Sequence, residues 1–410
     1  MTAAKVNKIS GEVQILNSLD HPNIVKYYEI YQDKDYLYIV MENCPGKTIN
    51  DKIIWGEKFY EETACKITQK LLFALNHCHS NKVTHRDIKL ENIIVNEFDH
   101  PKIIDFGLSK DASAKQILKS MAGTPYFMAP EILQGKSYNE KVDMWSLGVV
   151  IYTMLCGYRP FDGENAKEVF SAVETGEYRM GGKNWGNISN DAKDFVSSLL
   201  EINPKKRISA KQALKHPWFG LISEIKIKSV VEEEEKLDSQ TLASLQTYRE
   251  VHRLRKAVLN VLVKMLKPKE TFKYTEIFMR LDKDQTGSVS SEELANSLKA
   301  SDPTLTQADA RSIVKELDFA ENKKINYSEF LSAWIDLQKV LEDDDRTHAL
   351  YNQFDTDGSG IITEENIIES LGVMGKNISE KEIDDFITRY GENDGSGVTY
   401  ENFKNFLMYG

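Results

Sequence analysis

The order of apolar and polar positions divides the first 219 residues into strand-like and helix-like stretches. The first helix-like stretch carries Val13, Leu16 and Leu19 on one face and ends at a His-Pro pair. Two runs rich in β-branched and aromatic residues follow, at 24–31 and 36–41, and they predict a hairpin. The rest of this region has a helical pattern. A few strands followed by many helices predict an α+β domain.

A basic amphipathic helix is predicted from residue 242 to residue 266, after an exposed acidic connector at 220–241. Its apolar positions are Leu245, Tyr248, Val251, Leu254, Val258, Val261, Leu262 and Met265, and its basic positions are Arg249, Arg253, Arg255 and Lys256. This pattern fits two roles. The helix is either a plain packing element or a target that a calmodulin-like domain binds.

The last third of the chain is an internal repeat. Val289, Ile325, Ile362 and Val398 each follow a polar loop that contains Gly or Asn, and they are separated by 36, 37 and 36 residues. Chance rarely produces four copies at one period, so each copy is predicted to be one structural unit.

Length and charge narrow the classes of protein. At roughly 150 residues per domain, 410 residues favour two or three domains. The net charge is −11, and residues 269–410 hold 15 Lys and Arg against 29 Asp and Glu. This excess of carboxylates argues against nucleic acid as a partner and favours binding of a hard cation, with a solvated acidic surface as the alternative.

No segment predicts a membrane span or a secreted protein. The longest apolar run covers residues 147–158, whereas a transmembrane helix needs about 20 residues. No signal-peptide pattern occurs at the N-terminus, and the four cysteines show no paired spacing. The expected location is therefore cytoplasmic.

Three short segments carry the strongest chemical signal. Residues 85–92 read His-Arg-Asp-Ile-Lys-Leu-Glu-Asn, residues 105–107 read Asp-Phe-Gly, and residues 129–131 read Ala-Pro-Glu. Each segment is common alone, but their order and gaps together match the protein-kinase signature set. On these motifs the sequence resembles a eukaryotic protein kinase.

That resemblance implies roles in phosphoryl transfer. Asp87 would accept the proton of the substrate hydroxyl, and Lys89 would neutralise charge on the transferred phosphoryl group. Asn92 and Asp105 would bind Mg²⁺. Lys89 and Thr124 are the residues found in serine/threonine kinases, so the expected partners are protein substrates with Ser or Thr acceptors.

The same resemblance implies contacts with ATP and with the substrate chain. The expected ATP-binding residues are Met41, Glu42, Cys44, Glu91, Asn92 and Asp105. Glu91 also matches an acidic position that many kinases use to bind an upstream Arg of the substrate. Ser120 is a candidate for phosphorylation, which would pair its phosphate with Arg86.

The small lobe implied by the resemblance is incomplete in this sequence. Glu12 matches the helix glutamate, but no Gly-rich loop precedes it, and Lys5 lies too close to it to be the strand lysine. We therefore expect residues 1–410 to bind Ca²⁺ but to have little or no kinase activity, and an upstream segment with three strands to restore it.

Two of the four repeat loops predict calcium sites. Residues 282–293 match the EF-hand loop at every ligand position, and residues 355–366 match it except for Asn366 at position 12. The predicted ligands are Asp282, Asp284, Thr286, Ser288, Ser290 and Glu293 in the first loop, and Asp355, Asp357, Ser359, Ile361 and Thr363 in the third. The loops at 318–329 and 391–402 lack most ligands and are predicted to be structural partners.

Taken whole, the chain resembles the calcium-dependent protein kinases. The expected fold is multidomain, with an α+β protein kinase fold at 1–219, a connector and autoinhibitory junction helix at 220–268, and all-α EF-hand pairs at 269–410. The resemblance implies a calcium-regulated serine/threonine kinase that uses ATP, Mg²⁺ and Ca²⁺, and whose EF-hands bind the junction helix. The alternative is a non-catalytic, calcium-responsive pseudokinase scaffold.

Overall fold

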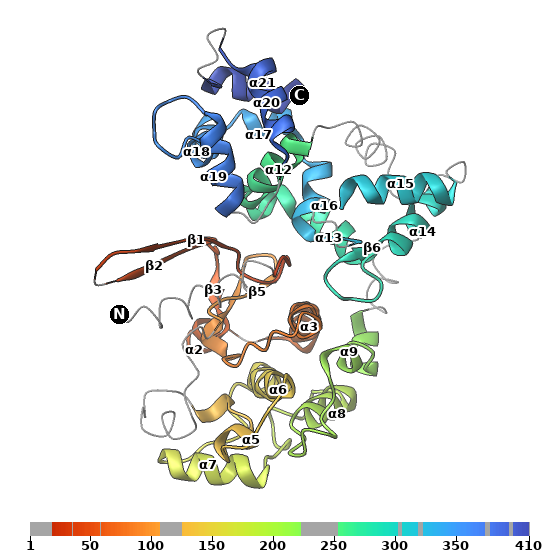
Figure 1. Cartoon of the computed structure of the whole chain (residues 1–410). Helices are drawn as coiled ribbons and strands as arrows, with labels where there is room; N and C mark the ends of the chain where they lie inside the picture. Colours follow the sequence, from red (N-terminus) through yellow and green to blue (C-terminus); the bar gives the residue numbers. More distant parts are fainter. Residues whose placement is uncertain are drawn as a thin grey trace. The chain divides into compact units, whose positions relative to one another are not determined.

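The computed structural model describes residues 19–34, 36–57, 59–106, 125–222, 253–301, 306–318, 323–373, 378–392 and 397–409. The chain forms two compact units. One consists of Met1–Glu233 with Gln285–Gly287, and the other of Glu234–Asp284 with Ser288–Gly410. Each unit is described by itself below, with the element labels of Figure 1.

The N-terminal unit contains short strands followed by many helices, as the sequence predicts. Its strands are β1 (Tyr27–Gln32), β2 (Leu37–Met41), β3 (Lys47–Thr48), β4 (Ile93–Val95) and β5 (Pro101–Ile103). Its α-helices are α2 (Ile49–Ile54), α3 (Glu61–Ser80), α5 (Pro130–Leu133), α6 (Lys141–Cys156), α7 (Ala166–Thr175), α8 (Asn190–Leu199) and α9 (Ala210–Ala213). Single 3₁₀ turns are η1 (Leu90–Asn92), η2 (Pro125–Phe127) and η3 (Pro217–Phe219).

The predicted hairpin is confirmed. β1 and β2 pair antiparallel from Tyr27 opposite Met41 to Gln32 opposite Leu37. Asp33 stabilises the turn, because its Oδ1 accepts a hydrogen bond from the Tyr36 backbone N–H at 2.6 Å. A second small sheet has the order β3-β4-β5.

Helix α6 is the centre of this unit. Every residue of α6 from Val142 to Cys156 is buried, which explains why its sequence is an almost continuous apolar run. The helix ends at Gly157, whose φ of 87° is the left-handed conformation that glycine adopts without strain. None of the described helices is long and apolar enough to cross a membrane.

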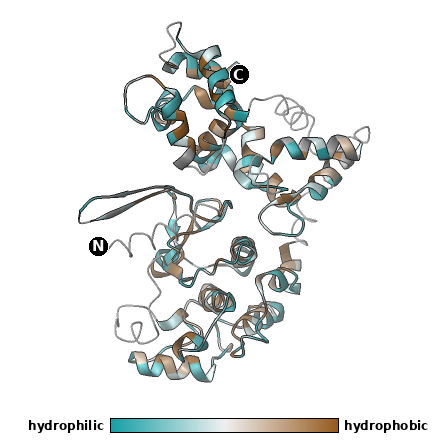
Figure 2. Cartoon of the chain, viewed as in Figure 1, coloured by the Kyte–Doolittle hydropathy of each residue, from teal (hydrophilic) through white to brown (hydrophobic). Residues whose placement is uncertain are grey.

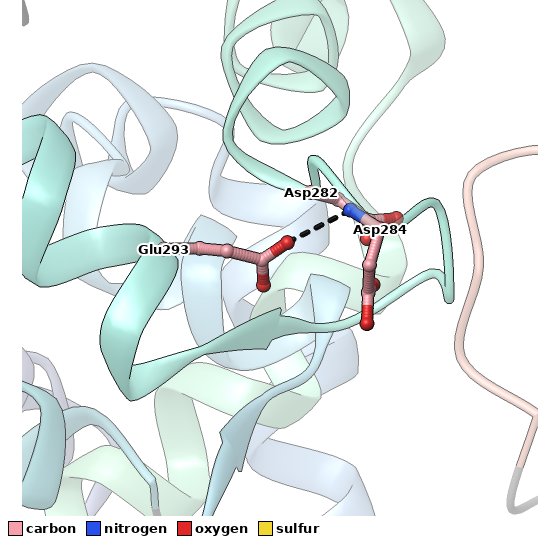
Figure 3. Close-up of side chains that lie close together, drawn as sticks. All are labelled: Asp282, Asp284 and Glu293. Atoms are coloured by element: carbon pink, nitrogen blue, oxygen red, sulfur yellow. Dashed lines mark hydrogen bonds between the residues drawn. The ribbon is translucent and has the colours of Figure 1, made fainter.

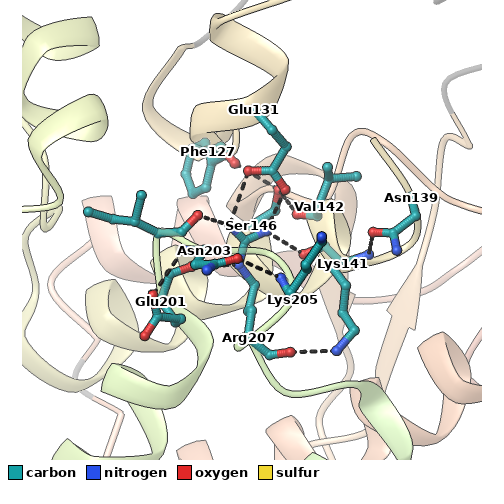
Figure 4. Close-up of polar contacts among 11 residues, drawn as sticks. Phe127, Glu131, Asn139, Lys141, Val142, Ser146, Glu201, Asn203, Lys205 and Arg207 are labelled. Carbon is teal, nitrogen blue, oxygen red and sulfur yellow. Dashed lines mark hydrogen bonds and ion pairs between the residues drawn. The ribbon is translucent and has the colours of Figure 1, made fainter. Parts of the chain in front are cut away.

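A buried ion pair joins distant parts of the unit, as Figure 4 shows. The Arg207 guanidinium donates to both carboxylate oxygens of Glu131, at 2.8 and 3.1 Å, and also to the Lys141 carbonyl at 2.8 Å. Both side chains are almost fully buried. The pair therefore ties α5 to the start of α6 and to the loop after α8.

Glu131→Gln is expected to lower the free energy of unfolding of the N-terminal unit by about 3 kcal/mol, because it leaves the buried Arg207 charge uncompensated. Urea unfolding followed by circular dichroism measures this change. Glu57→Gln is the matched control, since the exposed Glu57 pairs with Lys47 and Lys52 in solvent and its loss should have no measurable effect. Equal free energies of unfolding for the Glu131 and Glu57 variants would show that the Glu131–Arg207 ion pair does not stabilise the unit.

The C-terminal unit is helical. Its α-helices are α12 (Arg253–Leu262), α13 (Pro268–Leu281), α14 (Ser291–Ser301), α15 (Gln307–Leu317), α16 (Tyr327–Trp334), α17 (Leu337–Leu341), α18 (Asp344–Phe354), α19 (Glu364–Val373), α20 (Glu380–Tyr390) and α21 (Tyr400–Tyr409). It also contains the 3₁₀ turn η4 (Val263–Met265) and the strands β6 (Val289–Ser290) and β7 (Lys324–Ile325). Figure 2 shows hydrophobic and hydrophilic residues mixed along these helices, as expected for amphipathic helices.

The four repeats form two pairs through the residues that define the repeat. Val289 pairs with Ile325 in the β6–β7 ladder. Ile362 and Val398 exchange two backbone hydrogen bonds, both at 2.9 Å. The repeat predicted from spacing is thus confirmed as two pairs of loops.

The end of the predicted basic helix lies in the core of this unit. Leu254, Val258 and Leu262 of α12 are buried in the same cluster as side chains of the calcium-loop helices. Arg255 and Lys256, which the sequence pattern places among the polar positions, are also buried. Residues 242–252 of the predicted helix lie outside the described residues.

Candidate active site and calcium loops

Three of the predicted catalytic residues lie together between α3 and β4. The Lys89 ammonium donates to Oδ2 of Asp87 at 2.8 Å, and the Asn92 amide donates to the same oxygen at 3.1 Å and to the Asp87 carbonyl at 2.9 Å. Asn92 is buried in the turn η1, while the side chains of Asp87 and Lys89 are partly exposed. The carboxylate is therefore held in one orientation at the surface of the unit.

Helix α6 positions this loop through Asp143. The two carboxylate oxygens of Asp143 accept hydrogen bonds from the backbone N–H groups of His85 and Arg86, at 2.9 and 2.8 Å. Burial raises the pKa of Asp143, but the hydrogen bond from His79 and the nearby histidines outweigh it, so the pKa lies below its usual value. Arg86 has a φ of 70°, a strained conformation that these bonds maintain. No pattern in the sequence predicts this role of Asp143.

Asp105 follows β5 and is exposed. The next residue, Phe106, is buried against the His85 ring, with centroids 4.4 Å apart, and its N–H donates to the Tyr27 hydroxyl at 3.4 Å. Burial raises the pKa of Tyr27 to about 12, so this hydroxyl stays protonated. Buried Phe106 thus anchors the backbone that presents the Asp105 carboxylate.

The segment predicted to contact ATP links β2 to β3. Met41 is exposed and Cys44 is half-buried. Both oxygens of Glu42 accept from the Lys102 ammonium, at 2.7 and 2.8 Å. Because Lys102 lies in β5, three residues before Asp105, this ion pair joins the segment predicted to contact ATP to the strand that precedes the predicted Mg²⁺ ligand. No pattern in the sequence predicts this pairing.

Glu91 has an unusual carboxylate. Its Oε2 atom is buried and has no hydrogen-bond partner among the described residues. The expectation that Glu91 binds an arginine stays a prediction. Glu12, Thr124, Lys5 and Ser120 lie outside the described residues.

The first calcium loop gathers three carboxylates, shown in Figure 3. Oxygens of Asp282, Asp284 and Glu293 all lie within 4.8 Å of one another, and they form the one such group in the described part of the chain. Oε1 of Glu293 accepts from the Asp284 N–H at 2.9 Å, and Oε2 accepts from the Ser290 N–H at 2.8 Å. This set of hard oxygen ligands fits Ca²⁺.

The third loop is arranged around Asp355. Its two oxygens accept from the Ser359 and Gly360 backbone N–H groups, at 3.0 and 2.9 Å. Hydrogen bonds from Ser359 hold the pKa of the Asp357 carboxyl below its usual value. At position 12, the Asn366 side chain accepts from the Thr363 N–H at 3.0 Å and caps the next helix instead of offering two oxygens.

The other two loops are described in part. Asp318 Oδ2 accepts from the Lys323 N–H at 2.6 Å, and Lys323 itself has a φ of 64° at the position where a calcium loop carries Gly. In the fourth loop, Glu392 accepts from Thr399 at 3.1 Å. Residues 319–322 and 393–396 lie outside the described part.

Two family models match this chain, one in the N-terminal region and one in the C-terminal region. Residues 2–219 match the protein kinase domain, and residues 272–335 match the EF-hand domain pair. A solved structure, Rad53 1-466 in complex with AMP-PNP, has 32% identity and covers 53% of this chain and 56% of its own, with a TM-score of 0.47.

Two curated relatives match nearly the whole chain. Calcium-dependent protein kinase 5 of Plasmodium falciparum is 35% identical, and the match covers 98% of this chain and 70% of the relative. Calcium-dependent protein kinase 11 of Oryza sativa is 32% identical over 100% of this chain and 70% of the relative. With kinase and EF-hand regions in one chain, this protein belongs to the calcium-dependent protein kinase family.

Proposed function

We propose that this chain is a calcium-regulated kinase that transfers the γ-phosphate of ATP to Ser and Thr hydroxyls of protein substrates. The observation that carries the proposal is the convergence of Lys89 and Asn92 on one oxygen of Asp87, at 2.8 and 3.1 Å. Phosphoryl transfer depends on positioning and charge neutralisation, and this cluster supplies both.

Each residue of the cluster has a part in the reaction. Asp87, held by its two donors, is oriented to accept the proton of the attacking hydroxyl. Lys89 places a positive charge beside that carboxylate, where it also offsets negative charge that develops on the transferred group. Asn92 and Asp105 would hold Mg²⁺, which neutralises the phosphates of ATP when both are bound. The ion pair of Glu42 with Lys102 links the segment proposed to contact ATP to the strand that precedes Asp105.

The proposed substrates are proteins that carry an arginine upstream of the acceptor. The position of Glu91 in the turn η1, next to Asn92 of the proposed catalytic cluster, supports this, because its carboxylate can pair with a guanidinium. We also propose a cytoplasmic location, which the four free thiols support.

Phosphorylation of a Ser-containing peptide by a chain with a complete small lobe, with ATP and Mg²⁺ and with or without Ca²⁺, tests the activity. Asp87→Asn should abolish transfer while Mg²⁺-ATP still binds, because Asp87 acts on the hydroxyl rather than on the nucleotide. If the chain with the complete small lobe neither binds Mg²⁺-ATP nor transfers phosphate, the scaffold alternative is correct.

We propose that calcium acts through helix α12. Arg255 donates from Nε and Nη2 to the Leu407 carbonyl, at 2.9 and 2.6 Å, and from Nη2 to the Met408 carbonyl at 3.1 Å. These carbonyls belong to the last turn of α21, where no partner within the helix is available. A buried guanidinium thus attaches α12 to α21, the helix that follows the fourth loop.

The first calcium loop has a second route to α12. Its strand β6 pairs with β7, β7 leads into α16 at Tyr327, and α16 packs against α12. A change at Glu293 on calcium binding would therefore move elements that contact α12. Calcium shifts the equilibrium only if its affinity differs between the states with α12 bound and released.

Arg255→Met is expected to weaken the attachment of α12 by about 2 kcal/mol, because two helix-end carbonyls lose a charged donor. Hydrogen exchange of residues 253–262 should become faster in Ca²⁺, and the calcium concentration that gives half-maximal activity should rise. Arg253→Met, at an exposed position of the same helix, is the control. Unchanged exchange in the Arg255 variant would rule out this anchor.

A further inference from the structure

Arg159 is an exposed arginine fixed on an aromatic ring. Its guanidinium lies 3.9 Å from the centroid of the Tyr126 ring, a distance at which cation–π attraction holds the group in place. Among the described residues, no carboxylate lies within 4.0 Å of this guanidinium. Arg159 therefore presents an oriented positive charge to solvent, and the described part of the chain does not neutralise it.

Helix α6 anchors both the turn that carries Tyr126 and the loop of Asp87. Asp143 binds the backbone of His85, and one turn later Ser146 Oγ donates to the Phe127 carbonyl at 2.7 Å, which holds the turn that carries Tyr126. The catalytic loop and the Tyr126 turn are thus anchored on successive turns of one helix.

Arg159 itself is held from the same helix. Two residues after it, buried Phe161 stacks on Trp145 of α6, with centroids 5.4 Å apart and planes inclined by 7°. The loop that carries Arg159 is therefore fixed at its base, and only the guanidinium face away from Tyr126 is available for binding.

We infer that Arg159, held on Tyr126, is a specificity-determining residue that binds an anionic side chain of the protein substrate, either a carboxylate or a phosphorylated residue. This inference rests on the proposed function and extends its substrate class. Glu91 would attract a cation of the substrate and Arg159 an anion, so the preferred substrates carry opposite charges at two separate positions. An oriented guanidinium suits both anions, because its fork of N–H donors matches two oxygens at once.

The test uses the full chain with a complete small lobe and a set of peptides in which one Asp is moved, position by position, along both sides of a central Ser. A parallel set carries Asn instead of Asp. At one position, the Asp peptide should have a kcat/KM about threefold higher than the Asn peptide, as expected for a partly exposed ion pair. Phosphoserine at that position should raise the ratio to about tenfold. The change should appear in KM rather than in kcat.

Arg159→Ala should remove this preference, because it deletes the exposed guanidinium, whose contact within the described part of the chain is the Tyr126 ring. Arg159→Lys should keep part of it for Asp and less for phosphoserine. Tyr126→Leu should reduce it by releasing the guanidinium. Arg389→Ala is the matched control, because Arg389 is also exposed and stacks on a tyrosine, 5.5 Å from the Tyr390 centroid, in the other unit.

Binding of peptides whose acceptor Ser is replaced by Ala separates this inference from the proposed function. A preference in Kd for Asp or phosphoserine that depends on Arg159 supports the inference even if no phosphate is transferred, and absent transfer would then refute the proposed function alone. The inference is wrong if Asp, phosphoserine and Asn peptides bind equally, if none binds, or if Arg159→Ala keeps the preference.

Discussion

In a chain with a complete small lobe, Asp105→Asn is expected to reduce phosphoryl transfer by at least about 10³-fold, because the amide removes a charged Mg²⁺ ligand and the metal supplies several kcal/mol of charge stabilisation. The fold should be unaffected. Asp105 is exposed, and its φ of 55° is a left-handed conformation that Asn also adopts readily. Initial rates with a Ser peptide and calorimetric binding of Mg²⁺-ATP measure the effect.

Asp99→Asn provides a closely matched control. Asp99 also has a φ of 55°, and it lies in the turn between β4 and β5 rather than at the end of β5. The same substitution there changes one surface charge without touching the proposed metal site, so the rate and the binding should stay normal. Near-normal transfer by the Asp105 variant at saturating Mg²⁺ would show that Asp105 is not a metal ligand.

Glu293→Gln is expected to lower the calcium affinity of the first loop by about 100-fold. Replacing a residue that only orients a metal ligand already lowers affinity by about 10- to 100-fold, and Glu293 is expected to bind the ion directly. One oxygen of the Glu293 carboxylate lies within 4.8 Å of carboxylate oxygens of Asp282 and Asp284, so it is placed to bind the same ion as these two residues. Gln keeps one oxygen, which preserves the hydrogen bond from the Ser290 N–H and therefore the start of α14. Calorimetric titration with Ca²⁺ gives the affinity of each site.

Glu329→Gln makes the same change at the same position of the second loop. Glu329 caps α16 by accepting from the Asn326 N–H at 2.8 Å, which matches the capping contact of Glu293. The second loop has Ala320 where calcium loops carry a ligand and Lys323 where they carry Gly. Loss of the Glu329 carboxylate should therefore leave calcium binding unchanged. Equal losses in the two variants would contradict the ranking of the loops.

Much of the C-terminal unit is predictable because its signals are local. Loop position, ligand type and the apolar residue at position 8 lie within 12 consecutive residues, so one window of sequence contains a whole site. The resemblance to EF-hand proteins implies that the loops form pairs, and the backbone pairing of Val289 with Ile325 and of Ile362 with Val398 agrees with it. The environment of α12 is different, since its buried Arg255 finds its acceptors 152 residues away.

By itself, the sequence determined the order of the regions, the identity of Asp87, Lys89, Asn92 and Asp105, and which calcium loops keep their ligands. These depend on residue type and short spacing, which a linear pattern records. Only the tertiary structure decided which partners hold the site. Asp143 supports the catalytic loop from 58 residues away, and Lys102 reaches Glu42 across 60. Such contacts depend on how helices and strands pack, because folding brings distant donors and acceptors together wherever burial leaves them without water.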